Sequence, residues 1–194
     1  MGDLPPNASG YDLMAGTGEV WPHLLKAQPG VEKITAIDIS SGMYEKAMDR
    51  LHQMRQHKIE FIRDNILDSE LANSNTDFVI STFGLKTFNM EQMETLAKLI
   101  ARILKPGGKF SLIEASDPKG WILRPLYLFH LKIVLPVIEK IFLRGATDFR
   151  MIGIYSTNFG NARAFADLLR EQGLSVQYQS YFFGCASGVS GYKP

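Results

Sequence analysis

The chain has 194 residues, 45% of them hydrophobic and 21% charged, and its 21 basic and 20 acidic side chains give a formal net charge of +1. This size and composition predict a single domain over residues 1–194, and the near-neutral charge excludes the strong positive field of a general nucleic-acid binder. The single cysteine, Cys185, excludes an intramolecular disulfide and a four-thiolate zinc site, and with an N-terminus that lacks a signal sequence it favours a cytoplasmic protein.

The first half of the chain alternates short apolar strands with helices, as expected of the crossover units that build a parallel sheet. Ser40 and Ser41 are both suitable N-caps for the second helix. The predicted strands cover residues 10–14, 33–39, 59–63 and 77–82, and the predicted helices cover residues 20–26 and about 41–57.

The second half continues this pattern and then changes. The sequence KPGG at 105–108 should end a helix with a turn. The last two strands are joined at Gly184 by a connection so short that they must pair antiparallel. We therefore predict an α/β, Rossmann-like fold: a mostly parallel seven-stranded sheet with a C-terminal antiparallel hairpin and helices on both faces. The remaining predicted elements are helices over 90–104 and 165–172 and strands over 109–114, 175–182 and 185–192.

A 23-residue apolar segment, residues 121–143, raises the question of a membrane span. A charge at the bilayer centre costs about 2.5–3.5 kcal/mol, and this segment contains several ionisable residues and two prolines. We therefore reject a transmembrane helix here. The residues concerned are Arg124, Pro125, His130, Lys132, Pro136, Glu139 and Lys140.

The turn after the first strand combines an acidic residue, Asp12, with the sequence AGTG at 15–18. Glycine allows a ligand to lie against the backbone at a helix N-terminus, where free N–H groups suit an anionic or zwitterionic group. A NAD site would have a third glycine where this chain has Trp21, which disfavours an NAD oxidoreductase. The alternative interpretation of Gly16 and Gly18 is a plain strand-to-helix turn.

Asp38 closes the second strand, 22 residues after Gly16. A carboxylate at this position can accept hydrogen bonds from both hydroxyls of a ribose. The alternative is that Asp38 caps the following helix. At this spacing the glycine turn and Asp38 together favour a nucleoside ligand.

Five sequence motifs then occur in one order and spacing: AGTG, AIDISSGM, STFGL, LKPGGKF and the C-terminal SGYKP. With them the chain resembles the ubiquinone/menaquinone-biosynthesis C-methyltransferases, from Asp12 to Pro194. LKPGG is common to many methyltransferases, whereas FGL together with GYKP is more specific. The resemblance implies a class I methyltransferase that uses S-adenosylmethionine and releases S-adenosylhomocysteine.

The resemblance also implies roles for individual residues. The methionine part of the cofactor would be held by the first turn, the ribose by Asp38, and the adenine by flanking apolar side chains and a polar pair after the third strand. Met43 has the alternative role of a core side chain, since methionine often fills gaps. The implied cofactor residues are Asp12, Ala15, Gly16, Gly18, Asp38, Ile39, Met43, Asp64, Asn65 and, beside the sulfonium, Thr82.

The chain departs from the family in two places. Lys86 and Thr87 stand where family members have Arg-Asn after FGL, so the planar guanidinium that can hold a phenolate is replaced by a point charge. We keep both residues as candidates for contact with the acceptor, with a solvated Lys86 as the alternative. Eleven residues precede Asp12, whereas the family has longer lid helices there; the sequence is either truncated or that of a reduced relative with an open site.

Residues 120–150 match the family's insertion after the fifth strand, including Leu135-Pro136 and Asp148-Phe149-Arg150. We expect this segment to cover the substrate, to lie at a membrane surface, or to form a packed cover or dimer surface. His130 is a candidate general base, with an ordinary core or surface histidine as the alternative. Glu114 and Asp117, at the end of the fifth strand, are further candidates for polar contact with an acceptor.

We predict a methyltransferase that acts on carbon or oxygen of a small, apolar, aromatic or quinol-like acceptor, without a metal ion. The resemblance implies a homodimer, and peripheral membrane contact is a further expectation. The alternative function is a cofactor-binding subunit of a larger assembly that has lost turnover.

Overall fold

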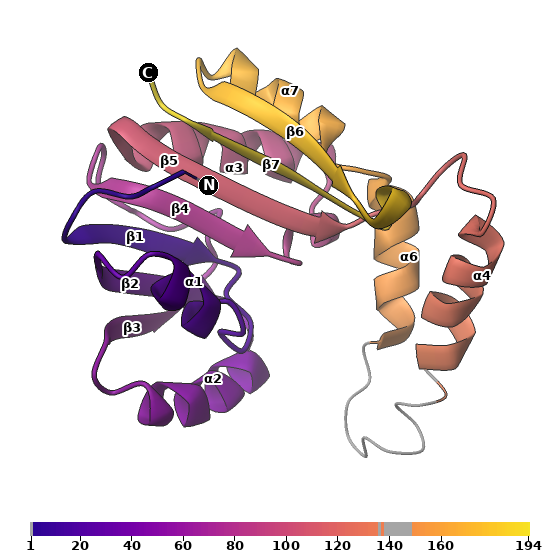
Figure 1. The fold of residues 1–194 in the computed structure, drawn as a ribbon, viewed down its shortest axis with the longest axis horizontal. Helices are drawn as coiled ribbons and strands as arrows, with labels where there is room; N and C mark the ends of the chain where they lie inside the picture. The colour runs from indigo at the N-terminus through magenta and orange to yellow at the C-terminus, as the bar shows by residue number, and fades with distance from the viewer. Residues whose placement is uncertain (1, 136, 138–148) are drawn as a thin grey trace.

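A computed structural model describes residues 2–135, 137 and 149–194. Strands from nearly the whole length of the chain form one sheet in the order β3-β2-β1-β4-β5-β7-β6 (Figure 1). The first five strands pair in parallel, and β7 pairs antiparallel with both β5 and β6. The predicted fold class is confirmed. The strands are β1 (Ala8–Leu13), β2 (Val31–Asp38), β3 (Lys58–Arg63), β4 (Thr76–Thr82), β5 (Leu104–Ala115), β6 (Ser175–Tyr181) and β7 (Ala186–Tyr192).

Helices cover both faces of this sheet (Figure 1). The apolar faces of α3 and α7 pack on one side, where Phe110 and Phe165 are fully buried. On the other side α1 and α2 pack against β1, β2 and β4, with Trp21 and Phe78 fully buried. The helices are α1 (Trp21–Ala27), α2 (Ser41–Gln53), α3 (Met90–Ile103), α4 (Arg124–Phe129), α6 (Phe149–Phe159) and α7 (Arg163–Glu171), and shorter helical turns are η1 (Leu85–Thr87), η2 (His130–Val134) and η3 (Phe182–Gly184).

The sequence predicted both ends of α2, and only the first is confirmed. The Ser40 hydroxyl accepts a hydrogen bond from the Met43 N–H at 3.3 Å and caps α2, as predicted. The prediction that α2 reaches His57 is wrong: the helix ends at Gln53, because the chain must turn before β3 begins at Lys58.

The prediction of a free turn at 105–108 also requires correction. This stretch belongs to β5, but the β4–β5 register shifts between Thr76 and Phe78, and Gly107 has a φ of +78°. The glycines therefore form an irregular start of the strand rather than a separate loop. Their main chain pairs with the C-terminus, since the Gly107 N–H donates to the Lys193 carbonyl at 2.8 Å and the Lys193 N–H donates to the Gly108 carbonyl at 2.9 Å.

The C-terminal motif GYKP has a structural role in this contact. The Lys193 ammonium donates to the carbonyls of Ala101 and Leu104 at 2.7 and 2.9 Å, at the C-terminus of α3. These carbonyls have no partner within the helix, and a cation there also complements the helix dipole. A Cβ on Gly191 would lie 1.8 Å from the Ser175 carbonyl oxygen, so β6 and β7 require glycine at this point. The two family motifs LKPGG and GYKP thus meet each other.

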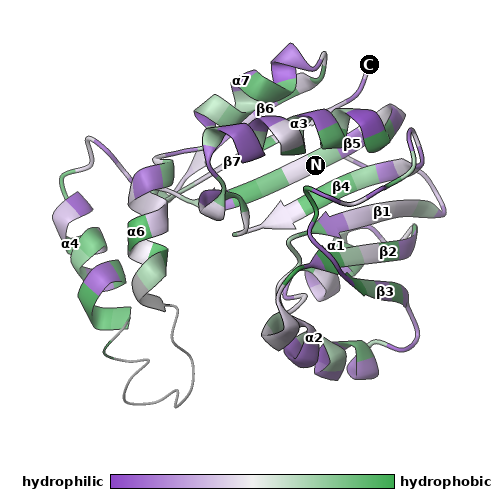
Figure 2. Cartoon of the chain, turned by 180° about the vertical axis from the view of Figure 1, so that it is seen from behind, coloured by the Kyte–Doolittle hydropathy of each residue, from purple (hydrophilic) through white to green (hydrophobic). Residues whose placement is uncertain are grey.

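The insertion forms an arm beside the sheet. Figures 1 and 2 both show α4 and α6 projecting at the end of the sheet toward which β4 and β5 point. Pro136 and Asp148, two residues of the matched insertion, lie outside the described residues. None of the helices in the described part of the chain has both the length and the apolarity needed to cross a bilayer.

We predict that Lys193→Met lowers the free energy of unfolding by about 1–3 kcal/mol, because two charge-assisted hydrogen bonds are lost. Urea denaturation measures the change. The matched control is Lys98→Met on α3, whose exposed ion pair with Glu94 should contribute roughly 0.5 kcal/mol or less. Equal losses in both variants would contradict the capping role of Lys193.

Candidate functional site

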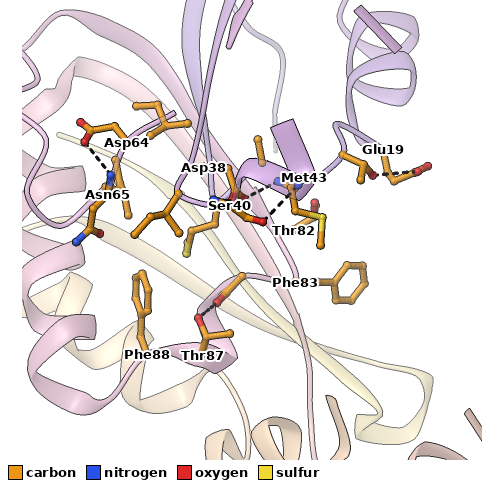
Figure 3. Close-up of a pocket in the computed structure, with 18 residues that line it drawn as sticks. Glu19, Asp38, Ser40, Met43, Asp64, Asn65, Thr82, Phe83, Thr87 and Phe88 are labelled. Carbon is orange, nitrogen blue, oxygen red and sulfur yellow. Dashed lines mark hydrogen bonds between the residues drawn. The ribbon is translucent and has the colours of Figure 1, made fainter. Parts of the chain in front are cut away.

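A pocket of about 560 Å³ lies at the carboxyl ends of β1, β2 and β4. Ligands of open α/β sheets bind at this edge, and the volume is within the range of ordinary small-molecule sites. Figure 3 shows Asp38, Ser40 and Met43 gathered at its centre, with Thr87 and Phe88 across from them. The lining residues are Met14, Ala15, Gly16, Thr17, Glu19, Ile37, Asp38, Ile39, Ser40, Met43, Asp64, Asn65, Ile66, Thr82, Phe83, Gly84, Thr87 and Phe88.

The Asp38 carboxylate holds two backbone segments of the pocket together. One oxygen accepts from the Gly16 N–H at 2.8 Å, and the other accepts from the Ser40 N–H at 2.9 Å. Each carboxylate oxygen can accept about two hydrogen bonds, so each keeps acceptor capacity for a ligand. Asp38 therefore fixes the glycine turn relative to the start of α2 and can still receive hydroxyl groups.

Glycine is required at the two positions of the turn for different reasons. Both have left-handed backbones, with φ of +56° at Gly16 and +73° at Gly18. A Cβ on Gly16 would meet no atom within 4 Å, whereas a Cβ on Gly18 would lie 2.5 Å from the Trp21 ring. Gly16 thus leaves room in the pocket, and Gly18, which does not line the pocket, leaves room for a buried tryptophan.

Asp12 lies beneath this turn and does not line the pocket. Its carboxylate is fully buried, and one oxygen accepts a hydrogen bond from the Trp21 ring N–H at 2.8 Å while the other has no partner. Burial, and to a lesser extent the nearby charge of Asp38, raises the pKa of Asp12 to about 7, against the lowering effect of the Trp21 hydrogen bond. Its role toward a methionine group stays a prediction.

Apolar and polar side chains meet on the α2 side of the pocket. Ile39 is 67% exposed and Met43 is 39% exposed, although both line the pocket. The alternative that Met43 is a core side chain is therefore wrong. Asp64 accepts from the Asn65 N–H at 2.8 Å, and this pair lies at one end of the pocket in Figure 3. Such a surface suits a flat ring with hydrogen-bonding groups on its edge.

The facing wall of the pocket is formed by residues 83–88, around η1. Phe83 lies between β4 and this turn with a φ of +62°, is 53% exposed, and donates its N–H to the Ile113 carbonyl at 2.9 Å. A Cβ on Gly84 would lie 2.5 Å from the Met14 Cβ, so the wall packs directly against the end of β1. The Thr87 hydroxyl donates to the Gly84 carbonyl at 2.8 Å and lines the pocket.

Lys86 is held away from the pocket by Glu114. The Lys86 ammonium lies 3.0 Å from one oxygen of this carboxylate, and the Lys86 N–H donates to the other at 2.9 Å. Lys86 also donates to the Phe83 carbonyl. The Lys86 side chain is only 9% exposed, so the alternative of a solvated surface charge is wrong. Burial raises the pKa of Glu114, and the Lys86 charge and hydrogen bonds oppose this effect.

Two further candidates lie on or near the arm. His130 begins η2 and is exposed, outside the pocket lining. Asp117 is buried and accepts two hydrogen bonds from Arg124, at 2.6 and 2.7 Å, which hold the pKa of that carboxyl below its usual range. Asp117 therefore anchors the base of α4 and does not line the pocket.

The structure brings together most of the predicted cofactor residues and adds others. Arg50 of α2 donates to the Thr17 carbonyl at 3.0 Å and to Glu19 at 2.6 Å, and so holds the loop at the pocket rim. No sequence motif marks this contact, because α2 and the loop are far apart in sequence. Phe83 lies within the motif STFGL and Phe88 lies three residues after it, so both were detectable as residues that follow the fourth strand.

Comparison with known proteins identifies relatives. The ubiE/COQ5 methyltransferase family matches residues 1–193. A demethylmenaquinone methyltransferase from Bacillus licheniformis is 28% identical over 192 residues, which are 98% of this chain and 81% of that protein.

Solved structures agree on the fold. An O-methyltransferase family protein from Burkholderia thailandensis superposes with a TM-score of 0.67 at 19% identity, over 96% of this chain and 51% of that one. Phosphoethanolamine N-methyltransferase 2 from Haemonchus contortus, in complex with S-adenosyl-L-methionine, superposes with a TM-score of 0.72 at 12% identity, over 100% of this chain and 50% of that one. The chain thus spans about half of each, and at these identities the likeness shows the fold alone.

We predict that Asp12→Asn stabilises the protein increasingly as the pH rises from about 4 to about 7. In this window the folded wild-type protein keeps the Asp12 proton while the unfolded chain, with a pKa near 3.8, loses it, so the wild-type free energy of unfolding falls with pH. Asparagine stays neutral and can still accept from Trp21.

Urea denaturation across this pH range measures the difference between variant and wild type. Asp167→Asn, which removes an exposed carboxylate far from the turn, serves as the matched control. A pH-independent difference for Asp12→Asn would show that Asp12 titrates normally.

Proposed function

The chain belongs to the ubiE/COQ5 methyltransferase family and is an S-adenosylmethionine-dependent methyltransferase, and we propose that its acceptor is a small apolar aromatic molecule of the quinol type. The observation that carries this proposal is the pocket itself: a glycine turn and a strand-end carboxylate on one side, and an aromatic wall on the other. Membership of the family establishes the reaction class, and the aromatic residues of the wall support the proposed class of acceptor.

The residues present fit the cofactor. Gly16 leaves open space where any other residue would place a Cβ, and Asp38 keeps acceptor capacity on both oxygens. Ile39 and Met43 expose apolar surface to the pocket, as a purine ring requires. The volume of about 560 Å³ accommodates a molecule of this size.

We assign each part of the cofactor to residues of this chain. Asp38 would accept from the ribose hydroxyls, Ile39 and Met43 would flank the adenine, and Asp64 with Asn65 would receive its polar edge. Ala15 and Gly16, above the buried Asp12 and Gly18, would hold the methionine part, and Thr82 would lie beside the sulfonium. When bound, the cofactor supplies an activated methyl group for in-line displacement, so the protein mainly aligns the reactants and excludes water.

The wall at residues 83–88 is suited to an apolar ring. Phe83 and Phe88 both line the pocket, and aromatic residues suit the packing of an apolar ring. The Thr87 hydroxyl donates to Gly84, so its lone pairs can accept a hydrogen bond from a phenolic hydroxyl of the acceptor. The relative named demethylmenaquinone methyltransferase is consistent with such an acceptor. A role for His130 as a base, and a homodimer, stay predictions.

Lys86 could steady a phenolate on the acceptor, or it could position the wall. Its ammonium contacts Glu114 and the Phe83 carbonyl, and it does not line the pocket. We therefore expect Lys86 to act by positioning Phe83 and Thr87 rather than by touching the acceptor.

We predict that Asp38→Ala weakens S-adenosylhomocysteine binding by about 1.5–3 kcal/mol, the size expected when a hydrogen-bonded carboxylate is removed. Isothermal titration calorimetry measures this change. Asp49→Ala, on the same helix-strand unit but outside the pocket lining, is the control. Unchanged affinity of the Asp38 variant would remove the ribose assignment.

A second prediction concerns Lys86 and turnover. The double variant Lys86→Met, Glu114→Gln avoids leaving one buried charge unpaired, which would cost stability by itself. If the pair positions the wall, this variant should lower both methyl transfer to a panel of hydroquinones and affinity for S-adenosylhomocysteine, because the wall lines the cofactor pocket.

Mass spectrometry of the methylated products and calorimetry give the two readouts. Slower transfer with unchanged affinity would instead support direct contact between Lys86 and the acceptor. Absence of transfer to any acceptor by a wild-type protein that binds S-adenosylhomocysteine would contradict the proposed acceptor class and favour the alternative of a cofactor-binding subunit.

A further inference from the structure

The arm presents an apolar face to solvent. Large hydrophobic side chains with exposed fractions of 49–88% recur from just before α4 through η2. On another side η2 packs on α6: Leu131 is buried, and a Cβ on Gly153 would meet the stem of the exposed Lys132 at 2.8 Å. A contiguous apolar patch of this kind marks an interaction surface more often than chance. We call the residues Ile122, Leu123, Leu126, Phe129 and Ile133 the arm face.

The base of the arm is fixed to the body of the protein, so the arm face is a property of the fold. Arg124 forms its two-pronged ion pair with the buried Asp117. The Tyr127 hydroxyl donates to the Cys185 carbonyl at 3.1 Å, which joins α4 to the start of β7. These contacts use the polar groups of α4 on the side toward the body and leave the apolar side chains outward.

An aromatic cluster continues the arm face at the β6–β7 turn. Phe182 and Phe183 are 80% and 79% exposed and have consecutive left-handed φ angles of 48° and 58°. The Trp121 ring stacks on Phe183 at a centroid distance of 5.4 Å. Such backbone conformations are disfavoured for bulky residues and persist at functional sites. Here they project two aromatic rings into solvent beside the arm.

Charge decides which occupant fits this surface. Residues 118–135 contain three Lys or Arg and no acidic residue, in a chain whose net charge is +1. No aspartate or glutamate occurs from Pro118 to Val137, where the arm face lies, whereas Lys119 and Lys132 do. An apolar helix face flanked by cations, with tryptophan and phenylalanine at its edge, is the composition that binds in the interface of an anionic bilayer.

We propose that the arm face, with Trp121, Phe182 and Phe183, docks the protein on the surface of an anionic lipid bilayer. This inference rests on the proposed function, because an apolar quinol-type acceptor would be dissolved in that bilayer. The arm projects at the end of the sheet toward which β4 and β5 point (Figure 1), and the pocket is lined by residues at the carboxyl ends of β1, β2 and β4, so docking there would bring the pocket toward the lipid surface. The helices of the arm would lie in the interface and not cross it.

The test is co-sedimentation of the full chain with phosphatidylcholine vesicles, with and without phosphatidylglycerol. The wild-type protein should bind the mixed vesicles, and added salt should weaken this binding. Leu126→Glu with Phe129→Glu should lower the partition coefficient by about a hundredfold, because two exposed apolar side chains no longer enter the lipid. Lys119→Gln with Lys132→Gln should lower it by about tenfold or more.

Matched controls lie elsewhere on the protein. Tyr192→Glu replaces a side chain that is 49% exposed at the other end of the sheet, and Lys58→Gln with Lys98→Gln removes two exposed charges away from the arm. Both controls should bind vesicles as the wild type does. All the variants should bind S-adenosylhomocysteine with wild-type affinity, which verifies that they fold.

Three results would overturn the proposal: no binding of the wild type to mixed vesicles, equal binding of the Leu126→Glu, Phe129→Glu variant, or a wild-type dimer that this variant dissociates. The last result would assign the arm face to a second copy of the chain. Failure of the proposed function would be detected separately, in solution without vesicles. There the wild-type protein would not bind S-adenosylhomocysteine, or it would not transfer a methyl group to short-chain hydroquinones.

Discussion

The rest of the site depends on the two hydrogen bonds that the Asp38 carboxylate accepts from the backbone. It joins the end of β2 to the glycine turn through the Gly16 N–H and to the start of α2 through the Ser40 N–H. Gly16 has a left-handed backbone and no side chain that could hold it in place, and this bridge supplies a fixed partner for its N–H. The same oxygens would accept hydrogen bonds from a ribose. The Asp38 carboxylate, which shapes the pocket, is therefore also the group proposed to bind the ligand.

A second buried carboxylate organises the facing wall. Glu114 is 1% exposed and accepts from both the backbone and the ammonium of Lys86, which places the turn that carries Phe83 and Thr87. Removing one partner of such a pair would leave a buried charge, which is why the pair is expected to be retained as a unit. Two strand-end acids, one on β2 and one on β5, thus set the two walls between which cofactor and acceptor would meet. The arm is anchored by Asp117, just after the same β5, and presents the surface proposed to dock on lipid.

Much of this arrangement follows from local sequence patterns. Hydrophobic periodicity located all seven strands, and the glycine turn with Asp38 at its spacing indicated the pocket. The sequence did not show that Gly18 serves Trp21, that Lys86 is bound to Glu114, or that GYKP caps α3, because each contact joins segments far apart in the chain or depends on burial. The predicted helix overran to His57 because the chain must turn before β3, whereas residues 105–108 are absorbed into the irregular start of β5.

The most direct test of the central claim is a crystal structure of the protein with S-adenosylhomocysteine. We expect electron density in the pocket between Gly16 and Phe88, with both ribose hydroxyls within hydrogen-bond distance of the Asp38 carboxylate. Density for the nucleoside elsewhere on the protein, or a ribose in this pocket that makes no contact with Asp38, would contradict it.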